Sequence, residues 1–250
     1  MSEETKRVAL ITGAGSGVGR ACAVRFAELG FNIVVNYLAV VEEAKKTQAL
    51  VEAAGGEALL AQCDVSHNEK VVDMIDQVKE RFGRIDVIVN SAGTTYYVPP
   101  TDLDGMCEGK WDRIMAVNTK GPFFVIRAAM SLLQQVEGAA VVNISSASAL
   151  SGLGSSIAYA ASKGALNTMT KTLARAYAPD IRINAVCPGP IDTRWLRQGL
   201  TEEEIEERVS TMPIPELIQP DDVADTVVYL ALESTKSTGQ ILVLDGGRTM

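Results

Sequence analysis

Residues 8–19 have the sequence VALITGAGSGVG, in which an apolar run leads directly into a loop with four glycines. Residues 8–12 predict a buried β-strand, and residues 20–29 predict the helix that follows the loop. Gly13 and Gly17 allow a tight backbone, and Gly19 allows the helix to approach the sheet. Because the first amides of such a helix face an anion, the stretch predicts a site for a dinucleotide pyrophosphate. The alternative is a strand-to-helix turn without a ligand, which this order of strand, loop and helix disfavours.

The rest of the chain alternates between apolar runs and stretches with helical period. The predicted strands are residues 33–37, 58–63, 85–90, 139–145, 181–187 and 240–244, and the predicted helices are residues 40–54, 69–81, 111–133, 158–178 and 221–232. The runs are apolar on both faces, which is typical of parallel strands covered by helices on either side. The pattern predicts an α/β fold of Rossmann type, with a doubly wound, mostly seven-stranded parallel sheet and right-handed crossovers.

Residues 1–250 are expected to form a single domain, because no repeat, low-complexity tract or linker divides them. Residues 190–219 interrupt the regular alternation and contain Trp195, Gly199, the acidic run 202–207, Pro213 and Pro215. A long insertion after a strand end is a position for a substrate lid, and a solvated helix explains the acidic run equally well.

The composition excludes several classes of function. A net charge of −8 without a cluster of lysine and arginine argues against nucleic acid as a partner. The four cysteines have no C-x-x-C spacing and there is one histidine, so we expect reduced thiols, a cytoplasmic location and no metal. The first residues do not form a signal peptide, and no apolar run approaches the roughly 20 residues of a membrane helix. We therefore expect no membrane partner.

Tyr159 and Lys163 are four residues apart, so on a helix both side chains project from one face. An unperturbed tyrosine has a pKa near 10 and is a poor acid or base at neutral pH, unless a neighbouring ammonium stabilises the phenolate. Ser146, near the end of the fifth predicted strand, is placed to hydrogen-bond a substrate oxygen. The alternative is an exposed tyrosine–lysine pair without a catalytic role.

The end of the second strand indicates which cofactor is preferred, since a carboxylate there binds a ribose hydroxyl and repels a phosphate. This chain has Asn36, Tyr37 and Leu38, and no acidic residue until positions 42 and 43. That absence favours NADP(H) over NAD(H). An arginine for the 2′-phosphate is not evident, with Ser16 in the loop, although Arg20 could contribute if its side chain folds back.

The chain resembles the short-chain dehydrogenase/reductase family over nearly its whole length, in the branch of carbonyl reductases and 3-oxoacyl reductases. The motifs that carry the resemblance are residues 12–19, Asn90-Ser91-Ala92-Gly93, Asn118, Ser146, residues 159–163, Pro188-Gly189 and Asp245-Gly246-Gly247. The resemblance implies hydride transfer between a nicotinamide and a ketone or secondary alcohol. In it, Tyr159 is the general acid/base, Ser146 orients the carbonyl and Lys163 binds the nicotinamide ribose and lowers the tyrosine pKa. Asn118 would hold a water that links Lys163 to solvent.

The resemblance also assigns the cofactor contacts. Asp64 and Val65 contact the adenine ring, residues 90–93 lie on the ribose side, and the segment after the sixth strand binds the carboxamide. The expected cofactor-binding residues are Gly13, Ser16, Gly17, Val18, Gly19, Tyr37, Asp64, Val65, Asn90, Ala92, Gly93, Tyr159, Lys163, Pro188, Gly189, Ile191 and Thr193. For two of them a structural role is the alternative, since Asp64 could cap a helix and Asn90 could end a strand.

The expected substrate pocket is mostly apolar and has few fixed charges. Its candidate residues are Thr94, Thr95, Tyr96, Ala147, Leu153, Pro190, Trp195 and Leu196. Such a pocket suits a ketone or secondary alcohol. A 3-oxoacyl thioester is an alternative substrate, although its phosphopantetheine arm favours basic surface at the mouth and the acidic run 202–207 gives it no support.

Two other functions fit the sequence less well. A catalytically silent cofactor sensor or scaffold is disfavoured because all four catalytic candidates are present. A nucleotide-sugar epimerase or dehydratase generally needs an additional substrate domain, for which the chain has no room. The resemblance further implies a homotetramer or homodimer built through residues 111–133, residues 158–178 and the last strand.

Overall fold

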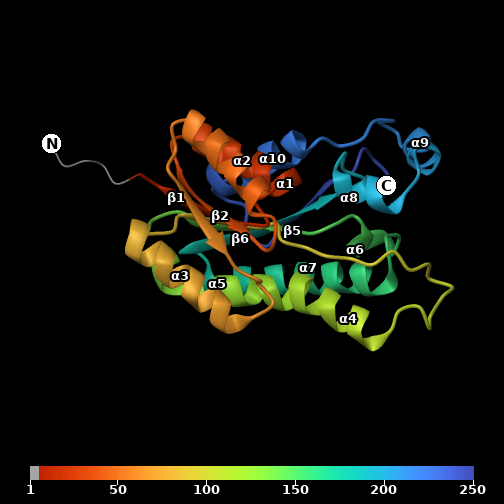
Figure 1. The fold of residues 1–250 in the computed structure, drawn as a ribbon, viewed down its shortest axis with the longest axis horizontal. Helices are drawn as coiled ribbons and strands as arrows, with labels where there is room; N and C mark the ends of the chain where they lie inside the picture. The colour runs from red at the N-terminus through yellow and green to blue at the C-terminus, as the bar shows by residue number, and fades with distance from the viewer. Residues whose placement is uncertain (1–5) are drawn as a thin grey trace.

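The computed structural model describes residues 6–250. Its centre is a sheet of seven strands in the order β3-β2-β1-β4-β5-β6-β7 (Figure 1). The strands are β1 (Val8–Thr12), β2 (Asn32–Tyr37), β3 (Ala58–Gln62), β4 (Val87–Asn90), β5 (Ala139–Ile144), β6 (Ile181–Pro188) and β7 (Ile241–Leu244). Every neighbouring pair is parallel. The predicted Rossmann-type α/β fold with a doubly wound parallel sheet is confirmed.

Helices cover both faces of the sheet. They are α1 (Gly17–Glu28), α2 (Val41–Ala53), α3 (Asn68–Phe82), α4 (Glu108–Met115), α5 (Gly121–Leu133), α6 (Ser148–Ser151), α7 (Ile157–Tyr177), α8 (Arg194–Gly199), α9 (Glu202–Ser210) and α10 (Pro220–Val228). Figure 1 shows α1, α2 and α10 on one face and α3, α5 and α7 on the other.

The side chains on the two faces of the sheet belong to two separate hydrophobic cores. Ile11 packs with Phe26 of α1 on one side of the sheet, and Leu10 packs with Met74 of α3 on the other. Successive side chains of a strand point to opposite faces, so a strand with a core on both sides must be apolar throughout. Each such buried side chain stabilises the fold by roughly 1.5–3 kcal/mol. This explains why β1 has no polar alternation.

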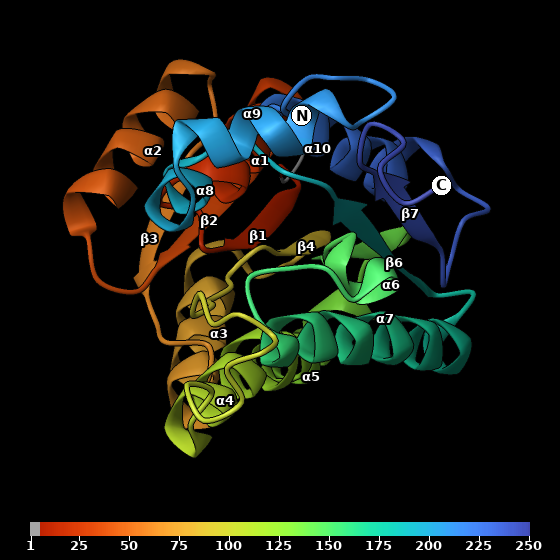
Figure 2. The same cartoon turned by 90° about the vertical axis from the view of Figure 1, so that its right-hand side faces the viewer.

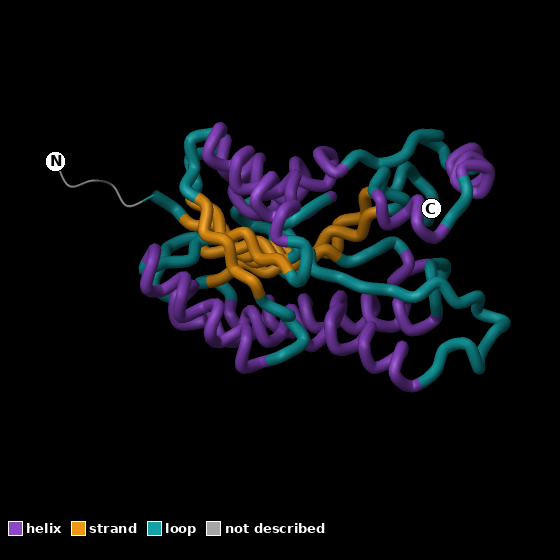
Figure 3. The backbone as a smooth tube through the Cα atoms, in the orientation of Figure 1, coloured by secondary structure: helices purple, strands orange, loops and turns teal. Residues whose placement is uncertain are grey.

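The strand order places a crevice at one end of the sheet. From β1 the chain runs outward through β2 to β3 at one edge, and it then returns to β4 on the other side of β1 and continues towards β7. The connections that leave β1 and β4 therefore run in opposite directions. In open α/β sheets ligands bind beyond the carboxyl ends of the strands at such a switch point. The loop after β4 and the segment after β6 both lie at this end, on the right of Figures 1 and 3.

The predicted helix over residues 111–133 differs from the observed one. Helical structure begins earlier, at Glu108, and a π-helical turn, η1 (Ala116–Lys120), separates α4 from α5. A second π-helical turn, η2 (Tyr229–Glu233), extends α10. A π-turn accommodates one more residue per turn than an α-helix and often occurs at functional sites. In this chain η1 contains Asn118.

Residues 190–219 form two helices rather than one loop. Helix α9 begins with a capping box between Thr201 and Glu204, in which each side chain accepts a hydrogen bond from the other residue's backbone amide. The acidic side chains of its first turn are exposed and complement the helix dipole, and Ile205 is buried beneath them. Figure 2 shows α8 and α9 in front of α1, at the end of the sheet where the crevice lies.

Candidate active site

A cleft with a volume of about 750 Å³ lies at the carboxyl ends of the strands. Its wall is built from the glycine-rich loop, the loops after β3, β4 and β5, the first turns of α7, and residues 188–196. Segments that are far apart in the sequence therefore meet at one site, as the strand order requires.

The glycine-rich loop leaves no room for side chains at two of its positions. Gly13 has a φ of +66°, and a Cβ atom there would lie 2.9 Å from the Cα of Ala92. A Cβ atom on Gly19 would lie 2.4 Å from the carbonyl oxygen of Gly13. Gly17 has a φ of +53°, a conformation that other residues rarely adopt. The loop thus packs closely against both α1 and the loop after β4.

Two polar side chains fix this loop in place. Asn36, buried at the end of β2, accepts a hydrogen bond from the Gly13 amide and donates to the carbonyl groups of Ala61 and Cys63. Thr12 accepts hydrogen bonds from two successive amides of the loop after β4, both at 3.0 Å. Neither residue was predicted from the sequence to shape the site, because their partners come from other strands.

The start of α1 fits the pyrophosphate of a dinucleotide. Ser16 is the N-cap and its side chain makes no capping hydrogen bond, and the first turn carries no acidic residue. The first amide groups of a helix have no partner within the helix, and the helix dipole favours an anion beside them. Ser16, Gly17 and Val18 all line the cleft. The positive-φ glycines and these amides together form a cradle of the required chemistry.

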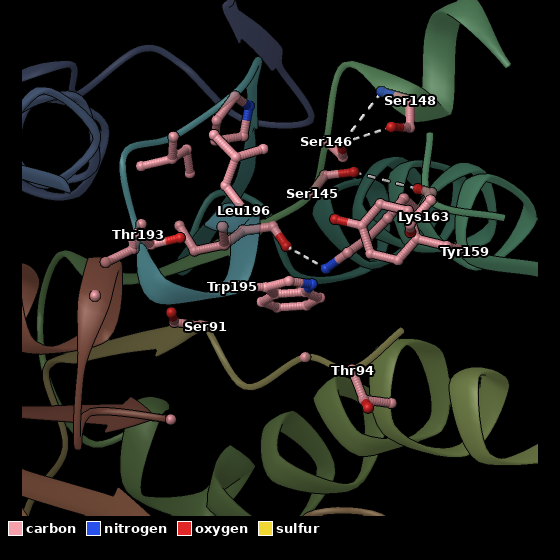
Figure 4. A pocket seen from close by; sticks show the side chains of 18 of the residues that line it. Ser91, Thr94, Ser145, Ser146, Ser148, Tyr159, Lys163, Thr193, Trp195 and Leu196 are labelled. Carbon is pink, nitrogen blue, oxygen red and sulfur yellow. Dashed lines mark hydrogen bonds between the residues drawn. The ribbon is translucent and has the colours of Figure 1, made fainter. Parts of the chain in front are cut away.

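The other end of the cleft gathers hydroxyl groups and one amine (Figure 4). Tyr159 lies in the first turn of α7, where its amide donates to the side chain of the N-cap Ser156. Ser146, two residues after the end of β5, accepts a hydrogen bond from the Ser148 amide and donates to the Ser148 hydroxyl at 3.1 Å. Both Ser146 and Tyr159 line the cleft.

Burial controls the protonation of Tyr159 and Lys163. Desolvation raises the pKa of Tyr159 to about 12, and a hydrogen bond with Ser146 opposes the rise. Desolvation lowers the pKa of Lys163 to about 8. The Lys163 amine donates to the Ile144 carbonyl at 2.8 Å and lies 5.8 Å from the centroid of the Tyr159 ring. Burial is the largest influence on the tyrosine pKa in this structure, and the role predicted for Lys163, lowering that pKa, remains a prediction.

Asn118 lies behind the cleft wall and is fully buried. Its Nδ2 atom donates to the Thr94 carbonyl and to the Ser162 hydroxyl, and its Oδ1 atom accepts from the Thr94 amide at 2.8 Å. The side chain thus ties the loop after β4 to α7. The role predicted for Asn118, holding a water molecule for proton relay, remains a prediction.

Most of the predicted cofactor-binding residues line the cleft. These are Gly13, Ser16, Gly17, Val18, Asp64, Val65, Ala92, Gly93, Tyr159, Lys163, Pro188, Gly189, Ile191 and Thr193. Gly19, Tyr37 and Asn90 are not on its wall. Tyr37 packs against the core, and Leu38, which follows it, lines the cleft instead. Asn90 donates to Asn143 beneath the site, and its buried Oδ1 atom has no hydrogen-bond partner within residues 6–250.

Most of the predicted substrate residues also line the cleft. Thr94, Ala147, Leu153, Pro190, Trp195 and Leu196 line the cleft. Thr95 and Tyr96 do not: the Thr95 hydroxyl bonds to that of Ser155, and Tyr96 is exposed. The Trp195 ring packs edge-on against the Tyr159 ring, with centroids 6.2 Å apart. Trp195 therefore covers the proposed proton donor.

Several cleft residues were missed from the sequence. They include Tyr97, Arg113, Ser148, Gly154, Arg194, Arg208 and Arg248. Arg113 holds the carboxylate of Asp64 at 3.0 Å, and Asp64 also accepts hydrogen bonds from Ser66. Of these residues, Arg208 could have been found from the helical period of residues 202–210. It lies three residues after the apolar Ile205, which is buried, and so on the same side of α9.

Within residues 6–250, no group of three or more side chains could hold a metal ion. None of the described helices combines the length and the apolar character that crossing a membrane requires.

Comparison with known proteins identifies the family. The family model described as "Enoyl-(Acyl carrier protein) reductase" matches residues 13–249. A ketoacyl reductase of the granaticin polyketide synthase of Streptomyces violaceoruber is 38% identical over 241 residues, 96% of this chain and 95% of that protein.

Solved structures agree with this result. A short-chain dehydrogenase/reductase from Burkholderia xenovorans superposes with a TM-score of 0.92 at 34% identity and covers 98% of this chain and 99% of its own. A 3-oxoacyl-[acyl-carrier protein] reductase from Brucella melitensis has a TM-score of 0.88 at 33% identity, over 98% of this chain and 92% of its own. The chain is an oxidoreductase, and it belongs to the short-chain dehydrogenase/reductase family, whose members use nicotinamide cofactors.

Proposed function

We propose that the protein is an NADP(H)-dependent carbonyl reductase that interconverts a ketone and a secondary alcohol, with Tyr159 as the general acid/base. The observation that carries this proposal is that the hydroxyl-bearing residues Ser146 and Tyr159 line the same cleft as the glycine-rich loop. Two O–H donors beside each other suit a single acceptor oxygen, such as that of a carbonyl group.

Each residue of the proposed site has its own role in the reaction. A nicotinamide bound in the cleft supplies the hydride in reduction and accepts it in oxidation. The Ser146 hydroxyl donates a hydrogen bond to the substrate oxygen and stabilises the charge that develops on it. Tyr159 donates its proton to that oxygen as the alcohol forms, and Trp195 excludes water from the tyrosine. Lys163 binds the ribose hydroxyls. To do so its amine turns away from the Ile144 carbonyl, and its positive charge then lies closer to Tyr159.

NADP(H) is the proposed form of the cofactor. The side chains of Asn36 and Leu38 line the cleft beyond β2, and neither is acidic. Glu43 also lines it, but hydrogen bonds from Lys46 and Arg20 hold the pKa of that carboxyl at about 2, so its charge is paired. The Arg20 guanidinium has folded back onto the loop, where it donates to the Gly15 carbonyl. Arg194 lies 3.8 Å from Glu43 and adds positive charge to the same corner. This excess of cations favours a 2′-phosphate.

The names of the relatives favour one substrate class as a second candidate. Both the Streptomyces and Brucella proteins are named as reductases of 3-oxoacyl or ketoacyl groups. A 3-oxoacyl thioester presents a ketone to the same two hydroxyls. The enoyl reduction in the description of the family model removes a C=C bond instead, and the paired hydroxyls favour a substrate oxygen.

We also propose that the protein is cytoplasmic and forms a homotetramer or homodimer. The support for assembly is a set of exposed apolar side chains on the elements that the resemblance assigns to subunit contacts. They are Trp111 on α4, Phe123 on α5, Ile157 on α7 and Val243 on the edge strand β7.

The test follows nicotinamide absorbance with purified protein, with NADPH and NADH in parallel. The panel contains aliphatic, aryl and cyclic ketones, 1,2-diketones, a 3-oxoacyl thioester and an enoyl thioester. We expect NADPH to be consumed with ketones, and Tyr159→Phe to lower kcat by about 10²–10⁴-fold with nearly unchanged NADPH affinity. Consumption with the enoyl thioester alone, or full activity of Tyr159→Phe, would refute the assignment.

A further inference from the structure

The charges on the cleft wall are not balanced. Three carboxylates line the cleft, and each has an arginine partner. The pairs are Glu43 with Arg20 at 2.7 Å, Asp64 with Arg113 at 3.0 Å, and Asp192 with Arg197 at 2.9 Å. Negative charge on the wall is therefore already neutralised by the protein itself.

Two arginines on the same wall have no such partner. Arg208, in the last turn of α9, and Arg248, near the end of the chain, both line the cleft. Within residues 6–250 neither guanidinium forms an ion pair or a hydrogen bond. Asp245 is the acidic residue closest in sequence to Arg248. Its carboxylate accepts hydrogen bonds from the amides of Gly247 and Thr249 and from the Thr249 hydroxyl.

The two guanidinium groups belong to one corner of the cleft. The Ile214 amide donates to the Gly246 carbonyl at 3.0 Å, which joins the segment after α9 to the turn that carries Arg248. Burial lowers the pKa of Arg248 and the positive charge of Arg208 lowers it further, whereas the negative charge of Asp245 raises it. Figure 2 shows α9 and the C-terminal end of the chain on the side of the molecule that faces the viewer. Like charges held together in this way raise the local positive potential.

Trp195 lies between this corner of the cleft and Tyr159, the proposed proton donor. The Trp195 ring contacts Tyr159, and its backbone carbonyl accepts a hydrogen bond from the Tyr97 hydroxyl at 2.9 Å. The charge of Arg208 acts in turn on the Tyr97 hydroxyl. Tyr159, Trp195, Tyr97 and Arg208 therefore follow one another from the reacting end of the cleft to its mouth. Ser146, Tyr159, Arg208 and Arg248 all line this one cleft.

We propose that the substrate carries an anionic oxygen group, a carboxylate or a phosphate, remote from its reacting carbonyl, and that Arg208 and Arg248 bind this group. The proposal rests on the carbonyl reductase function proposed above. Guanidinium groups bind both anions through charge-assisted, often bidentate hydrogen bonds, which makes them selective for the charged end of a substrate.

The substrate residues predicted from the sequence carry no charge, but arginines that were not predicted line the same cleft. The acidic run 202–207 gives no support to an anionic substrate from the sequence, but none of its residues lines the cleft. The residue that follows the run, Arg208, does line it. The carboxylates of helix α9 therefore lie off the cleft wall, whereas Arg208, which is also exposed, lies on it.

The first experiment compares matched pairs of neutral and anionic ketones with the wild-type protein and NADPH. Linear keto acids of increasing length and 4-acetylbenzoate are each paired with their methyl esters. Acetoacetyl-coenzyme A is paired with the neutral acetoacetyl-N-acetylcysteamine. We expect kcat/KM to be higher by at least about tenfold for the anionic member of one pair. Preference among the keto acids identifies a carboxylate, and preference for the coenzyme A thioester identifies a phosphate.

The second experiment uses Arg208→Met and Arg248→Met with the preferred pair. Each substitution should lower kcat/KM for the anionic ketone by about tenfold, mainly through KM, and leave the neutral partner within about twofold. Arg208→Lys should recover part of the loss, because it restores charge without the bidentate geometry. Lys79→Met, on the exposed face of α3, removes one positive charge away from the cleft and is the matched control.

The outcomes separate the two proposals. NADPH consumption that depends on Tyr159, without preference for any anionic ketone, overturns the anion site and leaves the reductase intact. Equal losses for neutral and anionic ketones in the arginine variants also overturn it. Absence of reduction with every ketone overturns the reductase, and the anion site is then tested by calorimetry with 4-acetylbenzoate. Binding that disappears in Arg208→Met supports the site, and equal binding to both proteins refutes it.

Discussion

At the scale of single residues, the protonation of Tyr159 determines how each direction of the reaction depends on pH. Burial raises its pKa to about 12, so the phenol is neutral and available as a proton donor at neutral pH. Alcohol oxidation needs the phenolate as a proton acceptor, so its rate should rise with pH, by up to about tenfold per pH unit below the pKa. Ketone reduction should not rise in this way. Initial rates in both directions, measured from about pH 6 to about pH 9, check this, and an oxidation rate that is flat with pH contradicts it.

Arg20 is the residue on which we expect the cofactor preference to depend. Its guanidinium lies at the glycine-rich loop and is paired with Glu43 at 2.7 Å. Arg20→Met takes away positive charge and leaves the Glu43 carboxylate paired with Lys46 but without its arginine partner at 2.7 Å, and both changes disfavour a 2′-phosphate. The Kd for NADPH should rise by about tenfold or more, and the Kd for NADH should stay the same or fall. Fluorescence titration of the two cofactors measures this, and parallel changes in both constants would contradict the role of Arg20.

At the scale of elements, the contact between the glycine-rich loop and the loop after β4 makes Gly13 sensitive to substitution. In Gly13→Ala, the methyl group would meet the Ala92 backbone at 2.9 Å on a residue with φ of +66°. We expect a loss of about 1–3 kcal/mol in the free energy of unfolding and a clear loss of NADPH affinity. Gly138→Ala is the control, because φ there is +76° but nothing lies within 4 Å. It should lower stability through backbone strain alone and leave NADPH affinity unchanged, and equal affinities in both variants would contradict the prediction.

Sequence patterns locate elements better than they locate single side chains. The strands and the glycine-rich loop were predicted because period and glycine placement are local properties of the chain. The π-turn around Asn118 was missed because one extra residue per turn leaves the apolar pattern of residues 111–133 almost unchanged. Tyr97 lines the cleft in place of Tyr96 because neighbouring side chains of an extended loop point in different directions, and no period identifies which one faces inward. Arg208 and Arg248 lie far apart in the sequence, and contacts between distant segments, such as the hydrogen bond between residues 214 and 246, bring them to the same cleft.

At the scale of the whole molecule, the open edge of the sheet indicates how copies of the chain associate. Strand β7 is the last strand of the sheet, and Val243 on it is 40% exposed. An edge strand with exposed apolar side chains is a surface for association. Replacing Val243 with glutamate places a charge where this proposal buries an apolar side chain, so the mass measured by light scattering should fall to that of a smaller assembly. Leu103, in the loop after β4, is 69% exposed, and Leu103→Glu is the control that should leave the mass unchanged. A wild-type protein that is monomeric at all concentrations, or an unchanged mass for Val243→Glu, would exclude β7 as the interface.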